Sequence, residues 1–164
     1  MMTIPVGLGE FQISDNPNEI LTIYGLGSCV GVGVFDPEAG IAGLLHAVLP
    51  ESGNGECRSA KYVDSGIKSL FSALEEAGAE EKRVKVCLVG GANLLTAAGH
   101  EGSFNIGDRN IESAQNQIAA RDLSICGEDV GGSIGRTMRL YVADGRITVR
   151  SMGKPERDLH DGGC

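Results

Sequence analysis

The chain has 164 residues and a formal net charge of −8, with 41% hydrophobic and 22% charged residues. This length suits one domain, and the sequence has no apolar tract of the roughly 18 residues that a membrane span needs. The acidic balance argues against nucleic acids and anionic lipid surfaces, because both favour basic faces. We therefore expect a protein or small-molecule partner, no nucleic acid and no direct membrane insertion.

The N-terminus and the cysteines indicate the cellular compartment and the redox state of the thiols. The N-terminus lacks the basic start and continuous apolar run of an export signal, so we expect a cytoplasmic protein. Five cysteines are an odd count, and they are widely spread along the chain. This pattern argues against a disulfide framework, and we expect most of these cysteines to be reduced thiols.

The first half of the chain predicts strands followed by a helix. Residues 3–15 and 19–24 are rich in apolar and β-branched residues, and each is predicted to be a strand. Apolar segments at 29–35 and 41–49 flank a turn that contains Pro37, which predicts a β-hairpin. Between Ser59 and Gly78 the spacing predicts an amphipathic helix with these inward positions: Val63, Ile67, Leu70, Phe71, Leu74 and Ala77.

The second half predicts a strand, a helix and a terminal hairpin. Residues 84–89 form the strand, and a helix opens near Asp108 with Ile111, Ala114 and Ile118 facing inward. Alternating residues at 138–142 and 147–151 flank Asp144-Gly145, a strong hairpin signal. Because strands and helices do not alternate regularly, we predict an α+β fold of layered β-sheets with flanking helices.

Cys29 and His46 are the candidate catalytic pair. A two-residue turn at Pro37-Glu38 would pair Asp36 with Ala39 and, further along the strands, Cys29 with His46. Directly opposed residues have Cβ atoms roughly 4.5–5.5 Å apart, so the thiol and the imidazole would meet. A bulge at the turn would shift the register by one residue and make the two side chains diagonal or opposite-facing.

An imidazole beside a thiol favours the thiolate, so this pairing predicts a lowered cysteine pKa and a nucleophile at neutral pH. Without further information, one cysteine and one histidine on neighbouring strands are more often ordinary buried residues. The glycine-rich run 25–31 admits two roles, a tight turn or backbone N–H groups for an oxyanion. No helix follows this run to complete a phosphate site, so we discount a nucleotide.

The other cysteines and histidines do not predict a metal site. Cys57, Cys87 and Cys126 lack the close cysteine or histidine partners of structural zinc sites and are interpreted as structural thiols. His100 falls in a predicted loop and His160 in a polar C-terminal segment. A metal-dependent hydrolase that uses His46 and His100 is therefore a weak alternative.

Seven short runs together resemble one known family. Gly-Leu-Gly-Ser-Cys at 25–29 is followed, seventeen residues after its cysteine, by the histidine of His-Ala-Val-Leu-Pro. The order and spacing of all seven resemble the CheD family of chemoreceptor glutamine deamidases. The runs are Gly7-Leu8-Gly9-Glu10-Phe11, Gly25-Leu26-Gly27-Ser28-Cys29-Val30, His46-Ala47-Val48-Leu49-Pro50, Lys61-Tyr62-Val63-Asp64, Gly90-Gly91-Ala92, Ile106-Gly107-Asp108-Arg109-Asn110 and Gly131-Gly132-Ser133-Ile134-Gly135-Arg136.

The resemblance implies a CheD-like domain over residues 1–152. The segment after Met152 is polar and glycine-rich, with too little apolar surface to offset the entropy of ordering it, so we expect a mobile tail at 153–164. The resemblance implies a fold similar to the catalytic domain of cytotoxic necrotizing factors, with Cys29 as nucleophile and His46 as its base. A family threonine that orients the histidine normally lies six positions before the cysteine. That position is Ile23 here and the threonine is Thr22, so the role falls to Thr22 only if a bulge restores its direction.

The implied reaction is deamidation of glutamine side chains of methyl-accepting chemotaxis receptors through a thioester, without a cofactor. The resemblance also implies binding to a CheC-type phosphatase. A non-catalytic adaptor that binds receptors and CheC is the alternative that the Ile23 substitution motivates.

Overall fold

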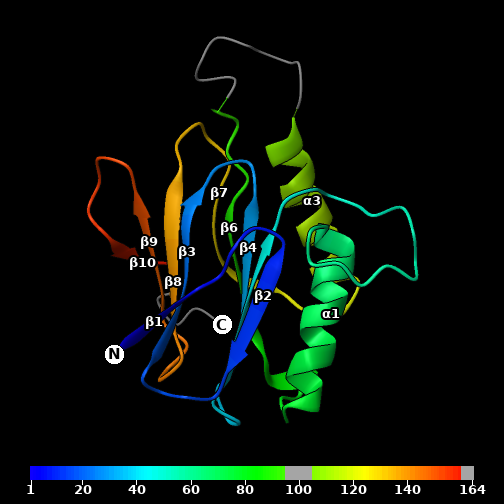
Figure 1. The fold of residues 1–164 in the computed structure, drawn as a ribbon, viewed down its shortest axis with the longest axis vertical. Coiled ribbons are helices and arrows are strands. Elements are labelled where there is room, and N and C mark those ends of the chain that lie inside the picture. The colour runs from blue at the N-terminus through cyan, green and yellow to red at the C-terminus, as the bar shows by residue number, and fades with distance from the viewer. Residues whose placement is uncertain (95–104, 160–164) are drawn as a thin grey trace.

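The computed structural model describes residues 1–94 and 105–159 as two five-stranded sheets and two α-helices stacked in layers (Figure 1). The helices cover the outer face of one sheet, and the second sheet covers its other face. The elements are β1 (Met2–Pro5), β2 (Glu10–Ser14), β3 (Glu19–Leu26), β4 (Val30–Asp36), β5 (Ile41–Ala47), α1 (Val63–Glu76), the short 3₁₀ helix η1 (Glu81–Arg83), β6 (Lys85–Gly90), α3 (Ile106–Ala119), β7 (Ile125–Val130), β8 (Arg136–Tyr141), β9 (Ile147–Ser151) and β10 (Arg157–Asp158).

Both sheets are mixed. The strand order is β1-β3-β8-β9-β10 in one sheet and β2-β5-β4-β6-β7 in the other. The pairs β1–β3 and β6–β7 are parallel, and the remaining pairs are antiparallel. This architecture confirms the predicted α+β class with layered sheets and flanking helices. Among the described residues, no helix is long and apolar enough to cross a membrane.

β4 and β5 form the centre of the molecule, and all of their residues are buried. Side chains alternate across a strand, so each strand contributes to two apolar layers. In β5, Ala42 and Leu44 belong to the layer between the sheets, whereas Leu45 and Ala47 belong to the layer against the helices. The same alternation directs His46 into the layer between the sheets.

The register of the β4–β5 hairpin differs from the prediction. Asp36 pairs with Ile41 and Gly31 pairs with His46, so the predicted pairs Asp36–Ala39 and Cys29–His46 are wrong. The turn is longer because the Asp36 side chain accepts hydrogen bonds from the N–H groups of Glu38 and Ala39, and its carbonyl accepts one from Gly40. A register shift of two residues keeps every side chain on its predicted face.

Both predicted helices and the terminal hairpin are confirmed, with small shifts of their ends. α3 begins at Ile106 with Asn105 as its N-cap, so Asp108 lies in the first turn and not at the cap. The first predicted strand is two strands, β1 and β2, separated by a loop in which Gly9 has a φ of 70°. β7 has no counterpart in the sequence-based prediction.

The structure describes the predicted mobile tail, 153–164, as far as residue 159. Arg157 and Asp158 form β10, which pairs with β9, and the N–H of Leu159 donates to the carbonyl of Ile147. The part of the expected tail that the structure describes therefore extends the first sheet. Cys29, Cys57 and Cys87 are free thiols, whereas Cys126 is disulfide-bonded, so the interpretation of Cys126 as a reduced thiol is wrong.

A buried carboxylate anchors the end of the hairpin. Asp36 is fully buried and pairs with Arg83 at 2.8 Å, and it also accepts the N–H of Glu80 at 2.8 Å. Burial alone would raise the pKa of the Asp36 carboxyl, but the hydrogen bonds from Arg83, Glu80, Ala39 and Glu38 outweigh burial and hold it well below its usual range. The Asp36 side chain therefore ties the β4–β5 turn to the segment that follows α1.

The variant Asp36→Asn tests this anchor. We expect its free energy of unfolding in urea to fall by about 2–4 kcal/mol at neutral pH, because one partner of a buried charged pair is lost. The matched variant Glu38→Gln, which alters an exposed carboxylate 3.4 Å from Arg83, should change it by less than about 0.5 kcal/mol. Because the folded-state pKa is depressed, the stabilisation is lost as pH falls below about 4, so wild type and Asp36→Asn should converge there. Equal losses in the two variants at neutral pH would contradict the role of Asp36.

Candidate functional site

The candidate nucleophile, Cys29, lies in the short loop between β3 and β4. Its carbonyl accepts a hydrogen bond from the N–H of Gly91 at 2.8 Å, and the carbonyl of Gly27 accepts one from Ala92 at 2.8 Å. Gly90 has a φ of 111° and lies so close to the Cys29 carbonyl that any side chain there would clash. The predicted Gly90-Gly91 break therefore holds the Cys29 loop against the end of β6.

The candidate base, His46, is 5% exposed and lies near the end of β5. Its Nδ1 is 3.1 Å from the main-chain carbonyl of Val6. A carbonyl oxygen can only accept, so Nδ1 carries the hydrogen and the neutral ring has its lone pair on Nε2. Nε2 is buried and has no hydrogen-bond partner among the described residues. Nε2 of His46 is thus a hydrogen-bond acceptor that is free to take a proton.

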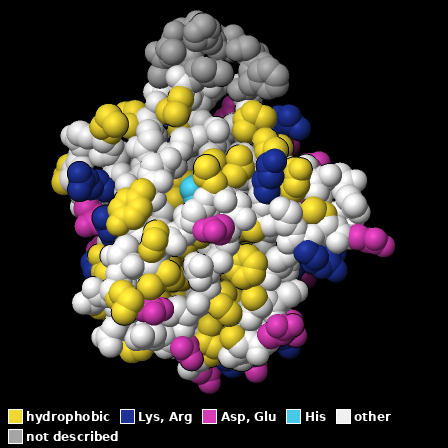
Figure 2. Space-filling view, in the orientation of Figure 1, with side chains coloured by type: hydrophobic (Ala, Val, Ile, Leu, Met, Phe, Trp, Pro, Cys, Tyr) yellow, Lys and Arg dark blue, Asp and Glu magenta, His cyan; other side chains and the backbone are white. Residues whose placement is uncertain are grey.

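Burial lowers the pKa of His46, against smaller raising effects of the Val6 hydrogen bond and the charge of Glu10. The imidazole is therefore neutral at pH 7 and able to accept a proton. Figure 2 shows the face on which β2 and β3 lie, where hydrophobic side chains gather and a small histidine surface is visible between them. The site is largely desolvated but open at one point.

Cys29 and His46 border the same layer. Gly31 is directly opposite His46, and Cys29 comes two residues earlier, just before the start of β4. Cys29 is half-buried and packs against the apolar layer between the sheets, which is also the layer that His46 faces. The arrangement is diagonal, for which Cα separations of roughly 7–8 Å are typical. Cys29 and His46 therefore lie at the same end of the layer between the sheets, but they are not the directly opposed pair that the sequence predicts.

Burial raises the pKa of the Cys29 thiol, against a smaller lowering effect of its own backbone N–H. The predicted lowering by the imidazole is therefore wrong for the unliganded protein. A neutral thiol therefore faces the same layer as a neutral imidazole.

Thr22 and Ile23 lie on opposite faces of β3. Ile23 belongs to the layer between the sheets, and its side chain approaches Gly31, the residue opposite His46. Thr22 is fully buried, and its hydroxyl donates to the carbonyl of Ile20 at 3.2 Å. Its link to His46 runs through the main chain, because the Thr22 carbonyl accepts the N–H of Val6 at 2.8 Å. The β3 bulge lies between Ile23 and Leu26, beyond Thr22, and does not restore its direction.

Asn110 on α3 joins the two loops that carry the candidate pair. It is fully buried, and its Nδ2 donates to the carbonyl of Ser28 at 2.8 Å and to the carbonyl of Val48 at 3.0 Å. One amide thus holds the residue before Cys29 and a residue two positions after His46. Asn110 ends the sixth of the seven runs that resemble the CheD family, which is the only sequence signal for it. The Val6 carbonyl has no such signal, because it belongs to the main chain.

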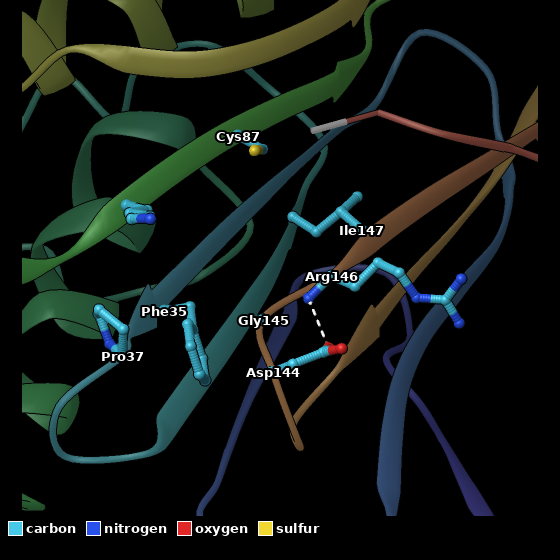
Figure 3. Close-up of a pocket in the computed structure, with 8 residues that line it drawn as sticks. Phe35, Pro37, Cys87, Asp144, Gly145, Arg146 and Ile147 are labelled. Carbon is cyan, nitrogen blue, oxygen red and sulfur yellow. Dashed lines mark hydrogen bonds between the residues drawn. The ribbon is translucent and has the colours of Figure 1, made fainter. Parts of the chain in front are cut away.

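The described residues give no second candidate for catalysis in a metal cluster or around Cys87. No cluster of three or more histidine, cysteine, aspartate or glutamate residues suited to a metal occurs among residues 1–94 and 105–159. His100 and His160 lie outside the described residues. A hollow of about 170 Å³ lies between the β4–β5 and β8–β9 turns. Figure 3 shows the residues that line it. Cys87 lines it, and burial raises the pKa of that thiol to about 11, so it is a poor nucleophile.

The titration of Cys29 distinguishes a neutral thiol from a resting ion pair. With iodoacetamide, the alkylation rate of Cys29 should rise about tenfold per pH unit from pH 7 towards 8.5, because only the thiolate reacts and the thiol pKa is raised. Peptide mass spectrometry separates this site from the half-buried Cys57, whose thiol has a lowered pKa owing chiefly to the backbone of Ser59 and the hydroxyl of Ser65. A plateau for Cys29 at neutral pH, abolished by His46→Asn, would instead indicate a thiolate–imidazolium pair.

The variant Asn110→Ala tests the clamp between the loops. Loss of both hydrogen bonds should release Ser28, expose Cys29 and increase its alkylation rate about fivefold, with a fall in unfolding free energy of about 2–4 kcal/mol. Ser113→Ala is the matched control, because Ser113 lies on the same helix and donates to the carbonyl of Pro50 at 2.8 Å. That control should lose some stability but keep the wild-type alkylation rate. Equal alkylation in both variants would rule out a specific effect of Asn110 on Cys29.

Comparison with known proteins identifies the family. The family model described as CheD chemotactic sensory transduction matches residues 48–151. A probable chemoreceptor glutamine deamidase CheD of Symbiobacterium thermophilum is 40% identical over 94% of this chain and 95% of its own length. A protein of the same description from Archaeoglobus fulgidus is 39% identical over 90% and 92%, and the chemoreceptor glutamine deamidase CheD of Thermotoga maritima is 34% identical over 93% and 94%. The family model covers more than half of the chain and these relatives cover at least 90% of it, so the chain belongs to the CheD family.

Proposed function

We propose that this protein deamidates glutamine side chains of chemoreceptors, with Cys29 as nucleophile and His46 as general base. The observation that carries the proposal is the buried, neutral His46, whose Nδ1 is fixed by the Val6 carbonyl while Nε2 remains unoccupied beside the layer that Cys29 borders. The names of the relatives, chemoreceptor glutamine deamidase, supply the substrate.

The first chemical step forms a thioester. Nε2 of His46 takes the proton of the Cys29 thiol as the sulfur attacks the side-chain amide carbon of the substrate glutamine. The amide oxygen becomes an oxyanion, and the backbone N–H of Cys29, which already lies near its own sulfur, is a candidate donor to it. When the tetrahedral intermediate collapses, the carbon–nitrogen bond breaks and His46 returns the proton to the departing ammonia.

The second step hydrolyses the thioester. Neutral His46 removes a proton from water, the hydroxide attacks the thioester carbon, and the carbon–sulfur bond breaks. Cys29 leaves as thiolate and recovers its proton from His46. The product is a carboxylic acid that releases its proton to solvent at neutral pH, so it is glutamate and each turnover adds one negative charge to the receptor. The two steps balance without a cofactor or a metal.

In this mechanism the Val6 carbonyl orients His46. A hydrogen bond from Nδ1 to a main-chain oxygen selects the tautomer and disperses the positive charge that forms on the ring during attack. Thr22 supports this arrangement through its own carbonyl, which holds the N–H of Val6. We therefore assign Thr22 an indirect role and not the direct contact that the family pattern implies.

Further features of the proposal follow from family membership. The protein would act in the cytoplasm, where receptor signalling domains lie, and would bind a CheC-type phosphatase. Similarity of its two packed sheets to the catalytic domain of cytotoxic necrotizing factors remains a prediction, as does a domain limit at residue 152.

The second candidate function is a non-catalytic adaptor that binds receptors and CheC. Two observations favour it: the side chain facing the His46 layer from β3 is Ile23, and the pKa of the Cys29 thiol is raised. The adaptor would need the fold and the exposed face but no proton transfer between Cys29 and His46.

Deamidation of a purified receptor cytoplasmic fragment separates the two functions. Peptide mass spectrometry should detect glutamine residues that gain about 1 Da with wild type, and Cys29→Ala and His46→Asn should each reduce the rate by at least about a hundredfold. Cys57→Ala is the control thiol variant and should keep the wild-type rate.

Thr22→Val refines the same experiment. If the Val6 carbonyl orients His46, this variant should keep the rate within about threefold, because it preserves the main chain. A loss comparable to that of His46→Asn would assign the orienting role to the Thr22 hydroxyl. If wild type binds the fragment but modifies no glutamine, the adaptor function replaces the enzyme.

A further inference from the structure

A hollow of about 420 Å³ opens beside the Cys29 loop, and its lining is basic. We call it the arginine hollow. Three arginines line it together with hydroxyl groups and an aromatic ring, and none of its lining residues is acidic. The residues used below are Arg136, Arg139, Arg150, Thr137, Ser151 and Tyr24.

The main chain connects this hollow directly to the candidate nucleophile. Gly25 lies on its edge and precedes Cys29 by four residues. Arg136 pairs with Leu26 across the β3–β8 ladder, and its Nη1 is 3.4 Å from the carbonyl of Gly90, the residue that contacts the Cys29 carbonyl. The end of β3, which leads into the Cys29 loop, therefore forms one edge of the hollow.

The three arginines differ in whether their charge is neutralised by an ion pair within the protein. Arg136 is 9% exposed and shares its charge with Asp129 at 3.3 Å, while its Nε is buried with no partner among the described residues. Arg139 pairs with Glu156 at 3.1 Å and approaches the ring of Tyr24. Arg150 is exposed and makes no ion pair within the described part of the chain. At least one full positive charge thus faces the hollow.

This lining contrasts with the composition of the whole protein. The chain carries 22 acidic residues against 14 lysines and arginines, so a chance selection of surface would be acidic. A protein of net charge −8 repels acidic partners unless a local basic site attracts them. The guanidinium groups and the hydroxyls of Thr137 and Ser151 are the donors that a carboxylate needs. Tyr24 and Met152, 55% and 81% exposed, offer apolar contacts to the stem of such a side chain.

We propose that the arginine hollow binds a carboxylate side chain of the protein substrate close to the glutamine that is deamidated. This inference rests on the proposed function. It also connects successive turnovers, because the reaction converts a glutamine into a glutamate that can occupy the hollow while a neighbouring glutamine reacts. The hollow would then favour substrates that already carry an acidic residue near the target.

The test compares Arg150→Glu with Lys82→Glu, which has the same change in charge. Lys82 is exposed in η1, at the start of the segment that leads into β6, whereas Cys29 contacts the end of that strand. With a receptor fragment in which the acidic residues near one target glutamine are kept, Arg150→Glu should raise KM about fivefold or more with kcat within twofold. Lys82→Glu should change KM less than twofold, and Arg150→Lys should recover most of the loss.

A second substrate makes the readout specific to the carboxylate. When the neighbouring acidic residues of the fragment are changed to glutamine, wild type should show a KM as high as that of Arg150→Glu, and the variant should show no further increase. Similar KM shifts in Arg150→Glu and Lys82→Glu, or an undiminished effect of Arg150→Glu on the neutral fragment, would overturn the proposal.

Binding keeps the inference separate from the proposed function. If wild type deamidates no glutamine, titration calorimetry with the same two fragments still measures whether affinity depends on Arg150 and on the carboxylates. If the affinity depends on Arg150 and on the carboxylates, carboxylate binding in the arginine hollow is supported even when the protein is not an enzyme. If the affinity depends on neither, the proposal is overturned. Circular dichroism of the Arg150 variants should match wild type, because the side chain is exposed and makes no ion pair that folding requires.

Discussion

The burial of β4 and β5 on both faces is the constraint on which the rest of the structure depends. One face of this pair packs against the helices and the other against the second sheet, so every side chain in the pair has a fixed apolar environment. A register shift of one residue would exchange the two faces and is therefore excluded energetically. The candidate site lies at one end of the β4–β5 pair. The packing of these strands in the core fixes the positions of the site residues, although the site itself lies at the edge of the core.

Three connections made by other elements complete the site at that end. Val6, directly after β1, supplies its carbonyl to His46, α3 supplies the Asn110 amide to both loops, and the Gly90-Gly91 break lets β6 approach Cys29. These elements are far apart in the sequence, and the site exists only when both sheets and the helical layer are assembled. The local chemistry is therefore a property of the complete fold, and the raised pKa of the Cys29 thiol reflects the enclosure that results.

Much of this arrangement can be predicted from the sequence, and the limits have physical causes. The helical spacing in 59–78 and the Asp144-Gly145 turn are local signals, and both elements are confirmed. The hairpin register failed because it depends on the Asp36 side chain, which caps a longer turn and binds Arg83 from a distant segment. β7 is half-exposed and pairs in parallel with β6, so it lacks the clear alternation of a hairpin strand. The motifs indicate Cys29 and His46 as a candidate pair, but no side-chain pattern predicts a main-chain carbonyl such as that of Val6.

The hydrogen bond between His46 and Val6 has a consequence for how the sequence of such a protein can vary. An orienting threonine is encoded by one residue and is lost with a single substitution. A carbonyl oxygen is present whatever side chain position 6 carries, so selection acts on the parallel pairing that places it and not on residue identity. Pairing of Pro5 with Thr22 and the bond from the Val6 N–H to the Thr22 carbonyl set that placement. The N-terminal strand, which contributes little to the core, would then be retained for the geometry of one ring nitrogen.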